Sequence, residues 1–498
     1  MRTDWRSRVL PDRLPRVQGG WLAREPAVRV SRLLAGLALL LVAALAAIAL
    51  ALVVTPLQTV AVAGQVIQVG ATRPDLSLSG PGEVDLFGQS LPTNLRFTGP
   101  VRPKLRLSQI TINSQLTNFV QGTKPSSVQR RLGSLLADGW LHYFGWESAI
   151  AGGVALIGFG AIAGWRRLPP RTTLKLLTTG LVITEAINVG AIMVTTYGAP
   201  AALRQVRSLN ELVGNEPAIP HGARKGPALR GVQAVVIGDS TAAGAGLALV
   251  PRPSRAARDC GRSADAYATD LAAANNWHVL NLACDSATIS HGLLGKQHRG
   301  GHRLPSQLAV AARARQASAV IVSVGADDLN WSTMLLYCAV APRCDDKAST
   351  AYFQQQLAKF SKDYLELLSQ LATLPGHPRV IINQYYNPFG PAPACLASTG
   401  LTAAKLHTLN SRLVALNTVL AKGARQFGFA SPQPDFTGHQ LCSTQPYVQG
   451  LRSRAPFHPT VLGQLAIALT DQTVLNQART GTGGAITSPS PTVTGQGG

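Results

Sequence analysis

Ser240 stands where an apolar run ends. Residues 235–237 are apolar and are followed by Gly238, Asp239 and Ser240, and then by small residues that suit a helix. This pattern predicts a buried parallel strand that turns into a helix at a serine. At such a junction the hydroxyl lies at the carboxyl edge of a sheet, beside the free N–H groups of the helix start. Ser240 is therefore a candidate nucleophile, although a plain helix cap would give the same pattern.

A histidine near the C-terminus could supply the base that such a serine needs. His458 is followed by Pro459 and then by a helical pattern. An imidazole held at this position is well placed to take the proton from a serine hydroxyl. Segments 281–288 and 324–328 follow apolar runs and carry turn residues. We expect their backbone N–H groups and side chains to lie near a developing oxyanion.

Alternating strand and helix patterns place these residues in one α/β domain, at 230–478. The alternation predicts right-handed crossovers and a parallel sheet covered on both faces, with the site at the carboxyl ends of the strands. The expected strands are 232–238, 279–282, 319–324, 380–383 and 427–430, and the expected helices are 306–316, 350–374, 402–427 and 460–475.

The order and spacing of these blocks resemble the SGNH hydrolases, also called GDSL esterases or lipases, and among them the actinobacterial branch with three disulfides. The resemblance covers about half of the chain and rests on 238–240, on 260–267 and on 458–459. It implies a flavodoxin-like three-layer sandwich with a parallel sheet. It also implies a carboxylic ester hydrolase with Ser240 as nucleophile and His458 as base, and with no cofactor or metal.

The resemblance assigns the oxyanion site as well. It implies that the backbone N–H groups of Ser240 and of Ser286, which stands where the family has a glycine, bind the oxyanion. The family's Gly-x-Asn-Asp block, whose asparagine is a further donor, is here Gly325-Ala326-Asp327-Asp328. An ionised Asp327 would repel an oxyanion. This side chain would need to be protonated, turned away or replaced by another donor such as Asn330.

A second departure affects the base. The family's acid three residues before the histidine is Ala455 in this chain. Some members of the resembled branch use a serine–histidine dyad in which a backbone carbonyl orients the histidine. The resemblance therefore leaves room for catalysis without an acid.

All of the cysteines lie in the second half of the chain, at Cys260, Cys284, Cys338, Cys344, Cys395 and Cys442. An even number without a CxxC pair predicts disulfides formed in an oxidising compartment, but spacing alone leaves their connectivity open. The resemblance implies sequential pairing, namely Cys260 with Cys284, Cys338 with Cys344, and Cys395 with Cys442.

The charge balance is strongly basic. The 498 residues include 46 Lys and Arg against 24 Asp and Glu, an excess of 46 − 24 = +22. Such a chain suits an anionic partner, namely lipid head groups, an acidic wall polymer or nucleic acid. We expect no nucleic-acid partner, because the sequence has no finger, no RNA-binding sheet motif and no aromatic-basic interleaving.

Three apolar segments, 33–54, 148–165 and 176–197, predict transmembrane helices. A signal peptide is the alternative for the first segment, but this apolar run is too long. The basic tail at 1–32 and the basic loop at 165–171 are cytoplasmic by the positive-inside rule. The cysteines then fall outside the cytoplasm, as disulfides require.

The remaining segments carry no catalytic pattern. Apolar and polar residues alternate between turns from residue 57 to about residue 122. This pattern predicts a small extracytoplasmic β domain at 57–140. Residues 199–229 are rich in proline and polar residues and predict an exposed linker, and 480–498 predict a disordered tail.

These patterns predict a multi-pass membrane protein whose extracytoplasmic domain is a serine esterase or lipase acting on esters of lipid or of cell-envelope glycan. Two alternatives stay open. The same acyl-serine could serve an acyltransferase or deacylase of envelope glycans. A non-catalytic hydrolase fold that binds envelope glycan or lipid is the other, suggested by Asp327 and Ala455.

Overall fold

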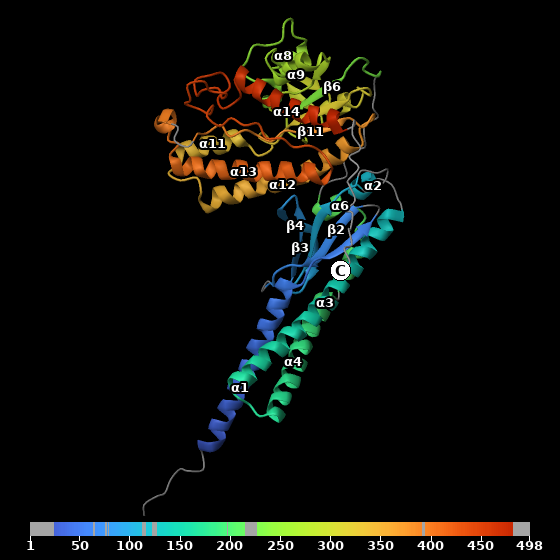
Figure 1. Cartoon of the computed structure of the whole chain (residues 1–498), viewed down its shortest axis with the longest axis vertical. Helices are drawn as coiled ribbons and strands as arrows, with labels where there is room; N and C mark the ends of the chain where they lie inside the picture. Colours follow the sequence, from blue (N-terminus) through green and yellow to red (C-terminus); the bar gives the residue numbers. More distant parts are fainter. Residues whose placement is uncertain are drawn as a thin grey trace, which may run out of the picture. The chain divides into compact units, whose positions relative to one another are not determined.

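The computed structural model describes residues 24–62, 65–74, 77, 79–111, 116–121, 127–196, 198–214, 227–390 and 394–481. The chain divides into two compact units, whose elements are labelled in Figure 1. One unit comprises Met1–Thr55 and Phe144–Met193, and the other comprises Pro56–Tyr143 and Val194–Gly498. Each unit is described by itself below.

The first unit is built from three long helices: α1 (Arg24–Val54), the second half of α3 (Ser127–Trp165), and α4 (Pro170–Thr196). Their segments Leu34–Val54, Arg131–Trp165 and Pro170–Val194 are long and apolar enough to cross a membrane. The three predicted spans correspond to these helices, each of which begins before its predicted span. The predicted tail at 1–32 likewise overlaps α1, and residues 1–23 lie outside the described chain.

A polar contact joins α3 and α4 within this unit. Asn188 Nδ2 donates to Glu147 Oε2 at 2.8 Å and to Ser148 Oγ at 3.1 Å. Glu147 and Asn188 are almost completely buried. Pairing of this kind lowers the cost of placing polar groups in an apolar environment.

The second unit begins with a small sheet, as predicted. Its strands are β1 (Gln58–Val62), β2 (Gln65–Ala71), β3 (Ser79–Leu86), β4 (Gln89–Thr98) and β5 (Pro103–Gln109), in the order β1-β2-β5-β3-β4. Buried and exposed side chains alternate along most of these strands, which gives the sheet one buried face. All neighbouring strands are antiparallel except β3 and β5.

Helices cover this sheet, so the region predicted as a β domain at 57–140 contains more than strands. Both α2 (Leu116–Gln121) and the start of α3 lie within that range. Leu132, Leu136, Trp140 and Tyr143 recur at helical spacing and are buried. An apolar stripe on a helix, and not a strand pattern, therefore fills 127–143.

The predicted exposed linker at 199–229 is also partly wrong. It contains α5 (Ala199–Arg204) and α6 (Leu209–Val213), and their apolar side chains are buried. Ser208 caps α6 by accepting a hydrogen bond from the Glu211 N–H. Residues 215–226 lie outside the described chain.

The α/β domain has a parallel sheet of β6 (Ala234–Gly238), β7 (Val279–Asn281), β10 (Ala319–Ser323) and β11 (Arg379–Ile382). The strand order β11-β10-β6-β7 is 4-3-1-2 in chain order, the doubly wound arrangement of flavodoxin-like folds. The predicted α/β class is therefore confirmed. The expected strand at 427–430 is reduced to one bridge between Ala430 and Ile381, because the preceding helix continues to Gln426.

Helices flank the sheet and provide its connections (Figure 1). They are α7 (Ser240–Ala243), α8 (Arg255–Asp259), α9 (Tyr267–Asn275), α10 (Gln307–Ala311), α11 (Trp331–Val340), α12 (Lys347–Ala372), α13 (Ala403–Gln426) and α14 (Val461–Gly481), with a 3-10 helix at Ala394–Thr399 and a hairpin of β8 (Gln297–Arg299) and β9 (His302–Leu304). Because α14 continues to Gly481, the predicted disordered tail cannot begin at residue 480, and residues 482–498 lie outside the described chain.

Three disulfides stabilise the loops of this domain. They join Cys260 to Cys284, Cys338 to Cys344, and Cys395 to Cys442, which is the pairing that the family resemblance implied. The described residues include no free cysteine.

The small sheet packs directly on α12 and α13 of the α/β domain. Phe87, which is buried, meets Tyr364 of α12 edge to face, with ring centroids 5.5 Å apart. Gln426 Nε2 donates to the Leu107 carbonyl at 2.7 Å, and Asn210 Nδ2 donates to Glu366 Oε2 at 2.8 Å. The small sheet is therefore part of the packed core of this unit.

We predict that Phe87→Ala lowers the free energy of unfolding by about 3–5 kcal/mol, because it leaves a cavity against Tyr364. Thermal and denaturant unfolding of the full chain in lipid nanodiscs measure this change. Leu336→Ala is the control, since that side chain is 66% exposed and its truncation should cost little. Similar small losses in both variants would show that the two parts do not support each other.

A buried carboxyl group lies between α14 and the sheet. Asp471 is fully buried, and its Oδ2 accepts a hydrogen bond from Asn383 Nδ2 at 3.1 Å. Neither Asp471 Oδ1 nor Asn383 Oδ1 has a partner among the described residues. Burial raises the pKa of Asp471 to about 7. The carboxyl group is therefore protonated in the folded chain at acidic pH.

We predict that Asp471→Asn stabilises the protein at pH 8 by up to about 4 kcal/mol and has little effect at pH 4. A raised carboxyl pKa means that the folded state retains a proton that the unfolded state has lost, so stability falls as pH rises from about 4 to 7. Asparagine removes this penalty and can bond to Asn383 Oδ1. Melting temperatures across this pH range test the prediction, with the exposed Asp345→Asn as control; a pH-independent difference would contradict it.

Candidate active site

The turn that presents Ser240 requires glycine at one position. Gly238, the last residue of β6, has φ +154°, and a Cβ atom there would lie 2.2 Å from the Ser323 carbonyl oxygen. Gln307 holds the same residue from the other side, because its Oε1 accepts from the Gly238 N–H at 2.7 Å and its Nε2 donates to the Gly238 carbonyl at 3.0 Å. The backbone before Ser240 is thus fixed at the sheet edge.

Asp239 caps α7 and is fully buried. Its Oδ1 accepts from the Thr241 N–H at 2.9 Å, and its Oδ2 accepts from the Tyr385 hydroxyl. Tyr385 in turn accepts from the Ala326 N–H at 2.9 Å. Burial, assisted by the charge of Asp327, raises the pKa of Asp239 well above its usual range. One tyrosine therefore joins the loop after β6 to the loop after β10.

The structure brings His458 and Ser240 together from positions 218 residues apart. His458 Nε2 lies 2.8 Å from Ser240 Oγ, and His458 Nδ1 lies 3.1 Å from the Pro456 carbonyl oxygen. A carbonyl can only accept, so this bond assigns the proton of a neutral imidazole to Nδ1 and leaves Nε2 as an acceptor facing the hydroxyl. The carbonyl of Pro456 thus orients the ring, and Ala455 contributes no acid.

Two side chains hold the histidine loop in place. Gln449 Nε2 donates to the Ala245 carbonyl at 2.8 Å and to the Pro459 carbonyl at 2.9 Å, so it joins the loop after Ser240 to the loop around His458. The Tyr386 hydroxyl donates to the Phe457 carbonyl at 2.8 Å. Phe457 has φ +68°, an unusual conformation for a bulky residue. These contacts hold that conformation next to the imidazole.

The loop after β7 carries Ser286, which is exposed and has φ +60°. This left-handed conformation is one that glycine adopts more readily than serine. The backbone at Ser286 therefore has the turn that a glycine at this position would give. Neither the Ser286 N–H nor the Ser240 N–H donates to an acceptor in the described part of the chain. The Cys284 N–H donates to the Gly238 carbonyl at 3.0 Å, so the two loops lie side by side.

The loop after β10 turns at Gly325, which has φ +134°, and then presents Asp327. Asp327 Oδ2 is buried and has no partner among the described residues. Burial raises the pKa of Asp327 to about 6, with a further contribution from the negative charge of Asp285 and an opposing one from Arg299. Asp285 and Arg299 form an ion pair with each other.

Two other side chains near this loop are already engaged. Asn330 Nδ2 donates to the Tyr352 hydroxyl at 3.0 Å, so that amide bonds to another side chain and does not take the place of Asp327. Asp328 Oδ1 accepts from the Ile289 N–H at 2.9 Å and joins the loop after β10 to the loop after β7. Burial raises the pKa of Asp328 to about 7.

The sequence predicts Ser240, His458, Ser286, Gly325 and Asp327 as site residues, and the structure brings Ser240 and His458 into hydrogen-bond contact. The sequence analysis missed Gln307, Tyr385 and Gln449, each of which bonds to a loop that is distant in sequence. A signal existed only for Tyr385, because it follows β11 and side chains at that edge of a parallel sheet face the site. Within the described chain, no cluster of three His, Cys, Asp or Glu side chains could hold a metal ion.

Comparison with known proteins supports the assignment of this domain. Residues 236–466 match the model of the GDSL-like Lipase/Acylhydrolase family. Lipase 1 of Streptomyces coelicolor is 28% identical over 240 residues, which cover 46% of this chain and 81% of that lipase. The α/β domain belongs to the GDSL-like lipase/acylhydrolase family. It is accordingly the domain of a carboxylic ester hydrolase.

Two solved structures are similar to about half of the chain. An extracellular lipase from Streptomyces rimosus is 22% identical with a TM-score of 0.36, and phospholipase A1 from Streptomyces albidoflavus NA297 is 25% identical with a TM-score of 0.36. Each alignment covers 50% of this chain and 99% of the other. The three apolar helices and the small sheet lie outside the family match.

Proposed function

We propose that this chain is a membrane-anchored serine hydrolase that cleaves carboxylic esters of lipid or envelope glycan outside the cytoplasm. The contact of 2.8 Å between His458 Nε2 and Ser240 Oγ, with Nδ1 held by a carbonyl, is the main support for this proposal. A hydroxyl in this contact can lose its proton to the imidazole as it attacks a carbonyl carbon.

The proposed reaction has two steps. Ser240 Oγ bonds to the ester carbonyl carbon while its proton passes to His458 Nε2, and the resulting oxyanion is bound by the N–H groups of Ser240 and Ser286. The intermediate collapses, and the alcohol leaves with the proton from Nε2. Water then loses a proton to His458 and attacks the acyl-serine, which releases the carboxylic acid and restores Ser240.

Asp327 assists this reaction only in its protonated form. A neutral carboxyl group can donate a hydrogen bond to the oxyanion, whereas a carboxylate opposes the charge that develops there. The unpartnered Oδ2 and the raised pKa of about 6 support this role. The contribution of Asp327 should therefore be larger on the acidic side of neutrality than on the alkaline side.

The membrane anchor and the extracytoplasmic location rest on three independent features. The chain has three helices that are long and apolar enough to cross a membrane. The basic residues before the first helix and between the last two favour a cytoplasmic position for these segments. The cysteines are paired, which suits an oxidising compartment.

We predict that Ser240→Ala lowers kcat/KM for p-nitrophenyl acyl esters by about a thousandfold or more, because it removes the attacking oxygen. His458→Ala should cause a comparable loss, and the exposed His377→Ala should not. A fluorophosphonate label that is lost in Ser240→Ala gives a second measurement. Unchanged hydrolysis in Ser240→Ala would reject the mechanism, and an acylated sugar formed in place of free acid would indicate acyl transfer.

We predict that Asp327→Asn raises kcat/KM about tenfold or more at pH 8 and changes it little at pH 5. Asparagine donates at every pH, whereas Asp327 loses its proton as the pH rises through about 6. The ratio of kcat/KM of the variant to that of the wild type is the quantity to plot, because effects of pH that both enzymes share cancel in it. A ratio that stays constant from pH 5 to pH 8 would contradict the role of Asp327.

A further inference from the structure

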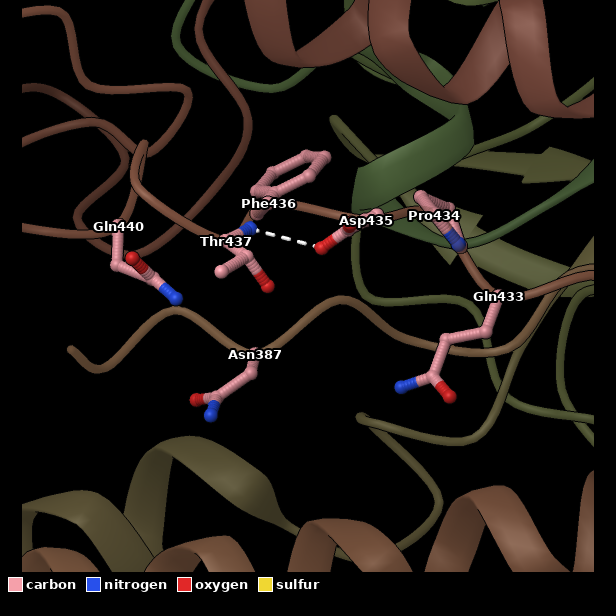
Figure 2. Close-up of a pocket in the computed structure, with 7 residues that line it drawn as sticks. All are labelled: Asn387, Gln433, Pro434, Asp435, Phe436, Thr437 and Gln440. Carbon is pink, nitrogen blue, oxygen red and sulfur yellow. Dashed lines mark hydrogen bonds between the residues drawn. The ribbon is translucent and has the colours of Figure 1, made fainter. Parts of the chain in front are cut away.

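A polar pocket of about 270 Å³ lies between two segments of the α/β domain (Figure 2). One wall is the segment after β11, with Asn387, and the other is the segment 433–440. Neither Ser240 nor His458 lines this pocket. Its volume is slightly below the range of about 300–1,000 Å³ that is usual for small-molecule sites. The pocket therefore suits one or two small rings better than an extended chain.

The two walls are tied together at both ends. The Gln384 N–H donates to the Pro432 carbonyl at 2.9 Å, and the Leu441 N–H donates to the Pro388 carbonyl at 3.1 Å. The disulfide between Cys395 and Cys442 adds a covalent link just beyond the second tie. The pocket is therefore held open by backbone bonds and does not depend on a ligand for its shape.

The amide groups in the pocket have fixed orientations. Asn387 Oδ1 accepts from the Phe389 N–H, and Gln440 Oε1 accepts from the Gly438 N–H, each at 2.9 Å. Since an amide oxygen is used in both cases, the NH2 group must face away from that backbone bond. Neither NH2 group has an acceptor among the described residues. The pocket thus offers two oriented donors.

The acceptors come from the opposite wall. Asp435 Oδ1 accepts from the Thr437 N–H at 2.9 Å, and the side chain of Asp435 is exposed. Hydrogen bonds from Thr437 lower the pKa of Asp435, so the group is a carboxylate at neutral pH. Gln433 Nε2 donates to the Tyr385 carbonyl at 3.3 Å and leaves its Oε1 free. Residues with donor groups and residues with acceptor groups therefore line the same pocket.

This combination selects among ligand classes. A carboxylate and several amides exclude an acyl chain, which needs an apolar lining. The carboxylate also repels phosphate and other anions, while a single acid among neutral amides is too little for a cation. Neighbouring hydroxyl groups, which both donate and accept, match the set. A neutral sugar carries such hydroxyl groups.

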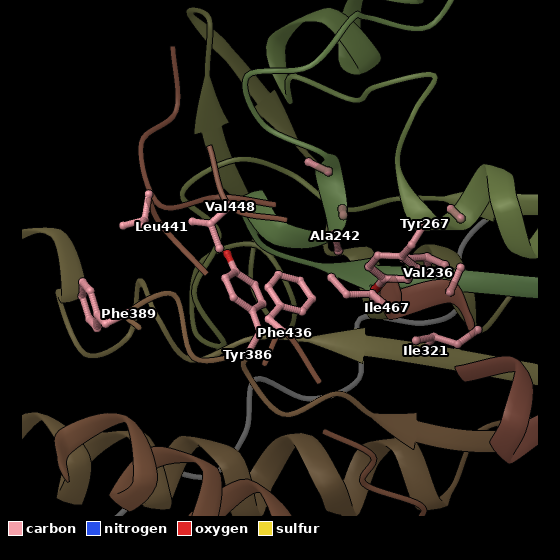
Figure 3. Packing of buried hydrophobic residues seen from close by; sticks show 14 of the residues in the cluster. Val236, Ala242, Tyr267, Ile321, Tyr386, Phe389, Phe436, Leu441, Val448 and Ile467 are labelled. Atoms are coloured by element: carbon pink, nitrogen blue, oxygen red, sulfur yellow. The ribbon is translucent and has the colours of Figure 1, made fainter. Parts of the chain in front are cut away.

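The pocket connects to the catalytic histidine through packed aromatic rings. Phe436, which lines the pocket, stacks on Tyr386 (Figure 3), and the two ring centroids are 4.4 Å apart. The Tyr386 hydroxyl bonds to the Phe457 carbonyl, next to His458. The carboxyl ends of β11 and β6 are two strand spacings apart, about 10 Å. The segment that carries Asn387 follows the first of these ends, and Ser240 follows the second.

We propose that this pocket binds a neutral sugar of the ester substrate, so that the acylated molecule is a glycan. The sugar hydroxyls accept from the NH2 groups of Asn387 and Gln440 and donate to the Asp435 carboxylate. The link to an ester rests on the proposed function, whereas the binding of the sugar does not. The pocket and the site at Ser240 can therefore be tested separately.

Binding of maltotriose, mannotriose and chitotriose to the full chain in lipid nanodiscs, followed by saturation-transfer NMR and calorimetry, tests this inference. Nanodiscs are needed because sugar-headed detergents would compete. Asn387→Asp and Gln440→Glu keep the oxygen that accepts from the backbone and lose only the NH2 donor. Gln354→Glu on the exposed face of α12 introduces the same charge elsewhere and is the matched control.

We expect saturable binding of at least one of these sugars, weakened tenfold or more in Asn387→Asp and Gln440→Glu and unchanged in Gln354→Glu. Ser240→Ala should lose ester hydrolysis and keep sugar binding, which separates this inference from the proposed function. The inference is overturned if none of the three sugars binds to the wild type, or if both pocket variants bind as the wild type does.

Discussion

The hydrogen bond between His458 and Ser240 depends on loops that the chain brings together from distant positions. A displacement of about 1 Å at either residue would break a contact of 2.8 Å. Buried side chains that bond to these loops keep the two residues in position. Gln449 joins the loop after Ser240 to that around His458, and Gln307 fixes the turn before the serine. Every one of these bonds ends on a backbone group, so it fixes the course of the chain.

The same principle extends to the other loops of the site. Tyr385 joins Asp239 to the Ala326 N–H, and Asp328 joins the loop after β10 to the Ile289 N–H after β7. Buried polar groups that are fully bonded make a network rigid, whereas unbonded ones are costly. Asp327 and Asp328 are exceptions, because the Oδ2 atom of each is buried and has no partner among the described residues. A buried polar atom without a partner costs stability, so these two carboxyl groups call for an explanation other than stability.

The sequence allowed the strands and the reactive side chains to be predicted because their signals are local. An apolar run that ends in Gly238-Asp239-Ser240 specifies a strand and a turn within a few residues. The roles of Gln307 and Gln449 depend on contacts with loops 69 and 204 residues away, and no local pattern encodes them. The first turns of α3 and the short helices in 199–213 were not predicted for a related reason. Their apolar faces are explained only by the sheet that they cover.

Two features of the site are linked by charge. His458 is oriented by the Pro456 carbonyl and not by an acid, and Asp327 lies among other carboxyl groups. Asp239, Asp327 and Asp328 already place three carboxyl groups at one sheet edge, and burial raises the pKa of each. A further carboxylate behind His458 would add a negative charge to this group and make its ionisation still less favourable. A neutral carbonyl orients the imidazole without that charge. It stabilises an imidazolium less than a carboxylate would, so in the proposed mechanism more of the stabilisation must come from donors to the oxyanion, including a protonated Asp327.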